Sequence, residues 1–281
     1  MSTPSIPDLT EPALPPIIGV VASQLRNPSQ QKILDEVTRQ LNVRGVITVL
    51  LNAETDVALT ALIQQATPLA LRGLLLLPGN KAISACNLPV LEIDAEPEWQ
   101  ADALRAGEVT AALLLAQGHQ RFGFLQSQPG DVAQKQSYCT TLQAAGMTLD
   151  AELTAADDDR NGAYQAMMQY LKKTRAAERI QALFCENDLL AFGAIQAVRD
   201  FGQGTHLAVA GFGDTEEARS PTWHLTSWSP DVRQIIGRAL DRWLGQQAEN
   251  SGEEGQLQQR YSHSGKVIPG EMSACGCAFR H

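Results

Sequence analysis

Two polar residues, Asn187 and Asp188, stand where an apolar segment ends and an amphipathic segment begins. Residues 180–184 predict a strand and residues 188–200 predict a helix. An asparagine carries a hydrogen-bond donor and an acceptor, and a carboxylate accepts hydrogen bonds, so the pair suits the hydroxyl groups of a sugar. The alternative is that the pair serves only the helix N-terminus. We expect Asn187 to contact a ligand and Asp188 to be the cap.

Two further residues occupy comparable positions. Asn27, with Gln24 beside it, lies in the loop after the first apolar run, and its alternative is an Asn-Pro turn that needs no ligand. Asp102 stands just before a predicted helix, where it either reaches a ligand or serves as an N-cap contributing about 1 kcal/mol. Both are candidate binding residues with a purely structural alternative.

Several residue groups have the types needed for metal, cofactor or catalytic chemistry but lack the full pattern. The three adjacent acids at 157–159 lack the spacing, Gly and Glu of an EF-hand, so a solvated loop is expected. The glycines at 211–213 lack the third glycine of a dinucleotide fingerprint. Cys275 and Cys277 with His281 are fewer than the four ligands of a structural zinc site. With no Ser-His-Asp, Gly-x-Ser-x-Gly or phosphate-loop pattern either, we expect no enzyme, metal or cofactor.

The elements that must position these residues are indicated by an alternation of short apolar runs with amphipathic stretches. Strands are expected at residues 17–22, 46–51, 73–77, 88–93, 122–125, 180–184 and 207–211, and helices at 30–41, 55–66, 102–117, 132–145, 163–173, 188–200 and 231–247. This order predicts parallel sheets covered by helices on both faces. Because two such series follow each other, we expect an α/β protein of two lobes.

Composition narrows the class of protein. The chain of 281 residues is 44% hydrophobic and 19% charged, the balance of a globular protein, and its formal net charge of −9 disfavours a broad nucleic-acid-binding face. No apolar run approaches the length of a membrane-spanning helix. The first sixteen residues are proline-rich and lack the basic and apolar parts of an export signal, so a cytoplasmic protein is expected.

The segment 182–202, which reads ALFCENDLLAFGAIQAVRDFG, is followed by LAVAGFGD at 207–214. Three more segments accompany them in order: IGVV at 18–21 with Asn27-Pro28, AG at 106–107 leading to QGHQRFGFL at 117–125, and HLTSW at 224–228. Together these segments resemble the effector-binding core of LacI/GalR-type bacterial transcriptional regulators over about residues 16–270.

The resemblance implies two Rossmann-like lobes with parallel sheets, joined by three crossover strands, as in type I periplasmic binding proteins, with a ligand in the cleft between them. The crossings are expected near residues 117–120, 226–230 and 260–265. The expected division is a leader at 1–15, a first lobe from 16–117 plus 227–257, a second lobe from 118–226 plus 258–270, and a flexible tail at 271–281.

The same resemblance carries four further cleft residues and shows where this chain departs from the family. An arginine that the family places early in one second-lobe helix is replaced here by Gln134, with Lys135 adjacent, and a lysine is no bidentate substitute. The family's Gly-Tyr/Phe-Asp-Asp reads Gly-Phe-Gly-Asp, so Gly213 stands in place of the first carboxylate and Asp214 is retained. We therefore expect either a ligand other than the family's commonest ones or weak binding.

The function implied is that of a cytoplasmic protein whose lobes close on a sugar, sugar acid or sugar phosphate. Lys135 or Arg105 would bind the charged group of an acidic ligand. The family's DNA-binding headpiece of about sixty residues precedes the core, whereas only sixteen residues precede Ile17, so we expect DNA binding only through a headpiece absent from this chain. A homodimer through residues 30–41 and part of 55–66 is expected, and no membrane partner. The alternatives are a solute-binding component of a sugar transport system and an enzyme that uses the cleft.

Overall fold

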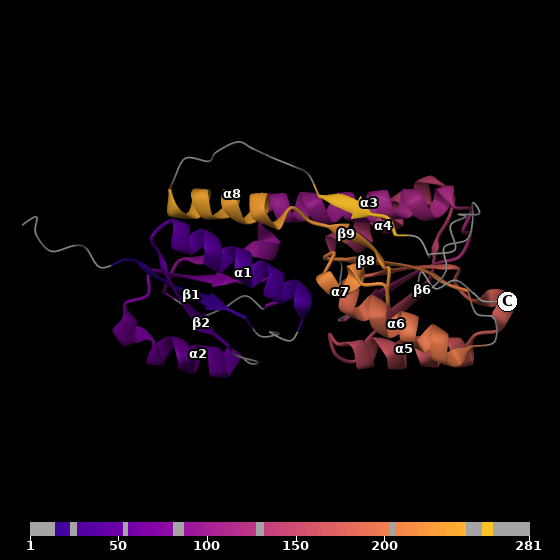
Figure 1. The fold of residues 1–281 in the computed structure, drawn as a ribbon, viewed down its shortest axis with the longest axis horizontal. Helices are drawn as coiled ribbons and strands as arrows, with labels where there is room; N and C mark the ends of the chain where they lie inside the picture. Colours follow the sequence, from indigo (N-terminus) through magenta and orange to yellow (C-terminus); the bar gives the residue numbers. More distant parts are fainter. Residues whose placement is uncertain are drawn as a thin grey trace, which may run out of the picture.

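The computed structural model describes residues 15–22, 27–52, 56–80, 87–127, 132–202, 206–245 and 255–260. They form two α/β lobes, each with a parallel or mostly parallel sheet between layers of helices (Figure 1). The expected fold class is confirmed. Outside the described residues lie the predicted leader and tail, Gln24, and the cysteines at 275 and 277. Among the described residues, no helix is long and apolar enough to cross a bilayer.

The first lobe holds a four-stranded parallel sheet in the order β2-β1-β3-β4. Its strands are β1 (Ile17–Val21), β2 (Ile47–Leu51), β3 (Gly73–Leu76) and β4 (Val90–Glu92), and its helical segments are α1 (Pro28–Val43), α2 (Asp56–Gln65), η1 (Thr67–Leu69), η2 (Ile93–Ala95) and α8 (Val232–Leu244). Helices α1 and α8 lie on one side of this sheet and α2 on the other (Figure 1). A helix from the end of the chain thus completes a lobe formed mostly by its beginning.

Alternating side chains of β1 explain why helices cover both faces of the sheet. Ile18 and Val20 pack with α1 and α8 in one core cluster, whereas Val21 packs with Leu59 of α2 in another. Successive side chains of a strand point to opposite faces, so an uninterrupted apolar run must be buried twice. Apolar helices on both sides satisfy that requirement.

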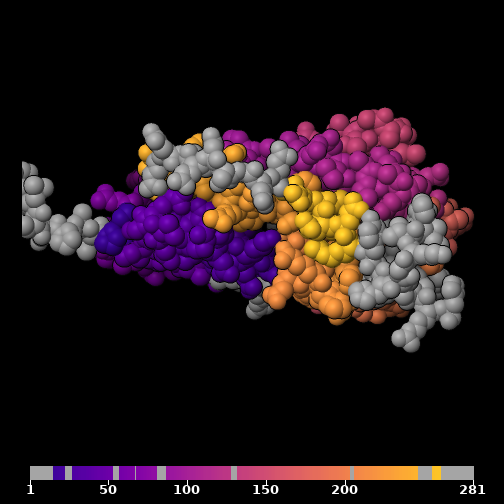
Figure 2. All heavy atoms as spheres, turned by 45° about the horizontal axis from the view of Figure 1, so that its top comes forward, coloured from indigo at the N-terminus to yellow at the C-terminus, as the bar shows by residue number. Residues whose placement is uncertain are grey.

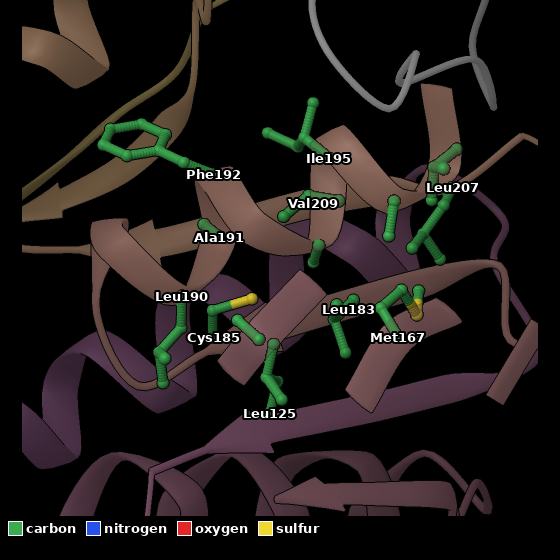
Figure 3. Packing of buried hydrophobic residues seen from close by; sticks show 14 of the residues in the cluster. Leu125, Met167, Leu183, Cys185, Leu190, Ala191, Phe192, Ile195, Leu207 and Val209 are labelled. Atoms are coloured by element: carbon green, nitrogen blue, oxygen red, sulfur yellow. The ribbon is translucent and has the colours of Figure 1, made fainter. Parts of the chain in front are cut away.

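The second lobe holds a six-stranded sheet in the order β10-β9-β8-β7-β5-β6, parallel except for β10, which runs antiparallel to β9. Its strands are β5 (Phe122–Gln126), β6 (Leu149–Thr154), β7 (Ala182–Cys185), β8 (Ala208–Phe212), β9 (Thr226–Ser229) and β10 (Gln256–Gln258), and its helical segments are α3 (Pro97–Ala116), α4 (Ala133–Ala144), α5 (Arg160–Lys173), η3 (Ala176–Glu178), α6 (Asp188–Phe201) and α7 (Glu216–Arg219). Helices α5 and α6 cover the face drawn in Figure 3, where Leu183 and Cys185 of β7 lie near Met167 and Leu190.

Helix α3 starts five residues earlier than predicted and packs on the second lobe rather than the first. Its Ala106 and Leu114 belong to the same core cluster as Phe122 of β5. At Gly107 the helix approaches α4 so closely that a Cβ would lie 2.0 Å from the carbonyl oxygen of Gln134. The missing side chain therefore sets the distance between the two helices.

The structure moves the expected lobe boundaries. The chain passes to the second lobe at the start of α3 rather than at 117–120, because α3 buries its small-residue face against α4. It returns after β9, as expected near 226–230, but β9 itself belongs to the second sheet. The third passage lies between α8 and β10, ahead of the expected 260–265. The first lobe thus comprises about 16–96 plus 230–245 of the described residues.

Strand β6 was not predicted. Its sequence, Leu-Asp-Ala-Glu-Leu-Thr, alternates half-buried with exposed residues, as an edge strand does. The period-two pattern was a usable signal, but it is weaker than the continuous apolar runs of the central strands.

Candidate functional site

A cavity of about 600 Å³ lies between the two lobes. The first lobe supplies the start of α1 and the segments after β3 and β4, and the second lobe supplies part of α3 and the segments after β5, β6, β7 and β8. Figure 2 shows the indigo and purple first lobe meeting the orange and yellow segments of the second. The carboxyl ends of parallel strands are the usual ligand side of such sheets, and this volume is typical of small-molecule sites.

Asn27 and Asn187 both lie on the cavity, as predicted, and one carboxylate joins them. The Asn187 Nδ2 donates to Asp158 Oδ1 at 2.8 Å, and the Asn27 Nδ2 donates to Asp158 Oδ2 at 3.1 Å. Because Asn27 belongs to the first lobe and the other two to the second, this hydrogen-bond bridge connects the walls of the cleft. Asp158, which was expected to be a solvated loop residue, is therefore part of the site.

The predicted division of roles between Asn187 and Asp188 is wrong. The Asn187 Oδ1 accepts a hydrogen bond from the Leu190 N–H at 2.9 Å, so Asn187 is the N-cap of α6. Asp188 is fully buried and accepts hydrogen bonds from the N–H and hydroxyl of Thr215 and from the Ser227 hydroxyl. Burial raises the pKa of Asp188, against the effect of these donors. Asp188 therefore connects Thr215, which follows β8, to Ser227 on β9, and it does not line the cavity.

Of the four residues carried over from the family, Gln134 and Gly213 line the cavity and the other two do not. The Lys135 ammonium lies 2.6 Å from Glu152 on β6, because neighbouring residues of a helix point about 100° apart. Asp214 is buried and pairs with Arg219 and Arg260. These are corrections to the expected contact residues.

The glycine at position 213 allows the two lobes to approach each other closely. Its φ of 125° suits glycine, and a Cβ there would lie 2.5 Å from the Ser29 Oγ of α1. The close approach lets the Lys32 Nζ donate to the Gly213 carbonyl at 3.0 Å, a second hydrogen bond between the lobes. Burial lowers the pKa of Lys32, against the attraction of Asp214.

Asp102 is neither on the cavity nor a helix cap, since α3 begins at Pro97. Its carboxylate accepts hydrogen bonds from the Trp228 Nε1 at 2.8 Å and from the backbone of Gly255. The Arg105 guanidinium, expected near an acidic ligand, lies on the surface and pairs with Glu108. Neither residue is placed to contact a ligand in this cavity.

Several cavity residues were missed. Trp99 and Phe212 line it as an edge-to-face pair with ring centroids 6.2 Å apart. Glu186 immediately precedes Asn187 and accepts hydrogen bonds from the N–H and hydroxyl of Ser127 at 2.7 and 3.0 Å. Burial, and to a lesser degree Asp158, raises the pKa of Glu186. The signal available in the sequence was position, because Glu186 and Phe212 stand at the ends of β7 and β8.

A family model described as a periplasmic binding protein-like domain matches residues 111–271, more than half of this chain. The chain belongs to the periplasmic binding protein-like domain family. Among curated relatives, the transcriptional regulator GalS of Salmonella typhimurium is 30% identical over 132 residues, which are 45% of this chain and 38% of GalS. The ribose import binding protein RbsB of Bacillus subtilis is 26% identical over 221 residues, 72% of this chain and 70% of RbsB.

Solved structures of this periplasmic binding protein-like fold align with most of the chain. The lactose repressor bound to an anti-inducer gives a TM-score of 0.69 at 22% identity, covering 87% of this chain and 98% of that one. The regulator CelR in complex with cellobiose gives 0.70 at 22% identity, covering 87% and 83%. The resemblance to a LacI/GalR effector-binding core is confirmed.

Proposed function

We propose that this chain is the effector-binding core of a LacI/GalR-type regulator, in which a small polar ligand in the interlobe cavity changes the balance between open and closed arrangements. The observation that carries this proposal is the cavity itself, which takes polar side chains from the strand ends of both lobes. The similarity to GalS supports the regulatory role. In this proposal the protein acts in the cytoplasm, performs no catalysis, and signals to DNA through a segment outside the described core.

The two hydrogen-bonded contacts across the cleft give the proposal a physical basis. Asn27 donates to Asp158, and Lys32 donates to Gly213, so two hydrogen bonds within the protein connect the lobes at the cavity. A ligand shifts such an equilibrium only by its difference in affinity for the two states. A ligand that replaces these contacts with its own groups would therefore set the distance between the lobes.

A homodimer through the first lobe is part of the proposal. Of the six most exposed large apolar side chains among the described residues, five belong to the first lobe: Val43, Ile47, Leu50, Val57 and Leu69. They lie at the end of α1, on the edge strand β2, on α2 and on η1. A sheet edge without a partner strand in the described part of the chain, with exposed apolar side chains on it and on the two helices that contact it, is typical of an interaction site.

A solute-binding component of a transport system is the second candidate, because RbsB aligns over more of this chain than GalS does. Both functions use the cavity. They differ in the partner of the closed form, which is a DNA-binding segment in a regulator and the rest of the transport system in a solute-binding component. An in-frame helix-turn-helix coding segment upstream of this sequence would favour the regulator, and an in-frame export signal would favour transport.

The ligand-binding proposal is tested by a thermal-shift screen with sugars, their amino, acid and phosphate derivatives, and nucleosides. A ligand that binds only the native state raises the melting temperature. Asn187→Ser keeps a capping oxygen on α6 but loses the amide that donates to Asp158, so it should abolish the shift while leaving the contribution of the helix cap to unliganded stability in place. Asn187→Ala loses the cap as well and should lower the free energy of unfolding by about 1 kcal/mol. A shift that is undiminished in Asn187→Ser would place the ligand elsewhere.

A further inference from the structure

The charged side chains that line the cavity are predominantly acidic. Glu92 and Asp94 come from the first lobe, and Asp158 and Glu186 come from the second. Lys32 is the one basic side chain among the described lining residues. Closing the lobes would bring carboxylates on opposite walls toward each other, and like charges in a partly dehydrated cleft repel strongly.

The described part of the chain does not neutralise these four carboxylates. None of them forms an ion pair with a described Lys, Arg or His, in contrast to Asp214 and Glu152, which do. Asp158 and Glu186 instead accept hydrogen bonds from neutral amide, hydroxyl and backbone groups. A carboxylate solvated in this way keeps its capacity to attract a cation.

Lys32 is engaged elsewhere. Its ammonium donates to the Gly213 carbonyl, and the carboxylates that act on it are Asp214 and Asp188, neither of which lines the cavity. The one basic group on the wall is therefore directed at a backbone carbonyl of the opposite lobe and not at the cavity carboxylates. The negative charge that faces the cavity is left without a match among the described residues.

Two observations independent of the acidic groups indicate what occupies this space. Trp99 and Phe212 present an aromatic pair to the cavity, and aromatic faces attract ammonium groups as well as the C–H face of a sugar ring. Gln30, which is 8% exposed and also lines the cavity, has an Oε1 acceptor with no hydrogen-bond partner. A ligand rich in donors would satisfy that acceptor.

A metal ion does not fit this arrangement. Within the described ranges, no three His, Cys, Asp or Glu side chains gather closely enough to hold one. The carboxylates instead come from separate segments on both walls of a cavity of about 600 Å³. Such a spread matches an organic cation several ångströms long.

We propose that the ligand is a hydroxylated organic amine of the amino-sugar type, with its ammonium group among the cavity carboxylates and its carbon face against Trp99. This inference rests on the proposed ligand-binding function and specifies its chemistry. It replaces the expectation of an acidic or phosphorylated sugar, since neither Lys135 nor Arg105 reaches the cavity.

Titration calorimetry with matched sets of probes tests the proposal. Each set shares one hydroxyl pattern in the gluco, galacto or manno series and contains the 2-amino sugar, the neutral hexose and the hexuronic acid. We expect at least one amino sugar to bind about tenfold or more tightly than its neutral partner, in keeping with a charge-assisted hydrogen bond, and the acids to bind weakest. A neutral or acidic probe as the tightest binder would overturn the proposal.

Variants connect the result to the cavity. Asp94→Asn and Glu186→Gln should each weaken the best amine about tenfold more than they weaken the neutral hexose, whereas Glu178→Gln, which changes an exposed carboxylate on η3, should weaken neither. If Asp94→Asn and Glu186→Gln bind the amine as tightly as the control Glu178→Gln does, the proposal is refuted. If a neutral or acidic probe binds and Trp99→Ala abolishes that binding, the ligand-binding function stands and only the amine is wrong. Binding of no probe from any set would count against both.

Discussion

At the scale of single residues, Asp102 joins three segments that meet near the crossings. Its carboxyl group on α3 accepts hydrogen bonds from Trp228 of β9 and from Gly255, just before β10. Burial raises its pKa from 3.8 to about 6, Asp231 adds to this effect, and the two hydrogen bonds oppose it. A group whose pKa is higher in the folded state binds a proton more tightly there, so its contribution to stability is lost as the pH rises from about 4 through 6.

We therefore predict that the free energy of unfolding of Asp102→Asn, minus that of the wild type, increases by about 2 kcal/mol from pH 4.5 to pH 7.5, which is most of the roughly 3 kcal/mol that a shift of about two pKa units represents. Urea unfolding of both proteins at the two pH values measures it. Other titrating groups affect both proteins alike and cancel in the comparison. A difference that stays constant with pH would show that the carboxyl group titrates as it does in the unfolded chain.

The candidate site could be predicted at this scale only in part, because position along the chain is readable but side-chain direction is not. Asn27 and Asn187 follow strand ends and do line the cavity. Which of two adjacent residues caps a helix depends on local backbone angles, so the cap was assigned to Asp188 although Asn187 is both the cap and the cavity residue. Asp158 was missed because three consecutive acids have the composition of a solvated loop, and only the fold places Asn27 opposite.

At the scale of elements, the α3–α4 contact depends on the glycine at 107. A Cβ there would meet the Gln134 carbonyl and the Ser137 hydroxyl at 2.0 and 2.2 Å, which the backbone of α4 cannot accommodate without moving. We predict that Gly107→Ala lowers the free energy of unfolding by at least about 2 kcal/mol, as overpacking does in a dense core. Urea denaturation with a fluorescence readout measures it.

Gly237 of α8 provides the matched control. A Cβ at that position would meet only the end of the Gln40 side chain, at 3.3 Å, which a shift of a few tenths of an ångström relieves, so Gly237→Ala should be close to neutral, with a gain of up to about 1 kcal/mol from helix propensity. The same substitution in two helices thus has opposite expected signs. If both variants lose stability equally, close packing is not what distinguishes position 107.

The elements were predictable where their apolar pattern is continuous, and less so at their ends. The central strands β1, β3, β7 and β8 fall within a few residues of their predicted positions. Helix α3 begins early because Pro97 suits the first helical turn, a start signal that outweighs the polar residues following it. It belongs to the second lobe because it packs against α4, and no local pattern of the sequence predicts that contact.

At the scale of the whole molecule, we predict a dimer in solution. Static light scattering at tens of micromolar should give about twice the chain mass of 30.4 kDa. Val57→Asp places a charge on α2 at a side chain that is 82% exposed and should shift the protein toward the monomer, because burying an unpaired charge in an interface is costly. Leu104→Asp, the corresponding change on α3, should leave the dimer intact. A monomeric wild type would contradict the prediction.

The three passages of the chain between the lobes also determine when the protein can fold during its synthesis. The first sheet needs α8 to bury Ile18 and Val20, and the second needs β9 and β10 at its edge. Both closing segments lie in the last fifth of the sequence. At about 5–20 residues per second on a ribosome, most of the chain therefore emerges while the first sheet lacks a covering helix and the second lacks its edge strands, and a nascent chain in that state is exposed to aggregation until the last segments arrive.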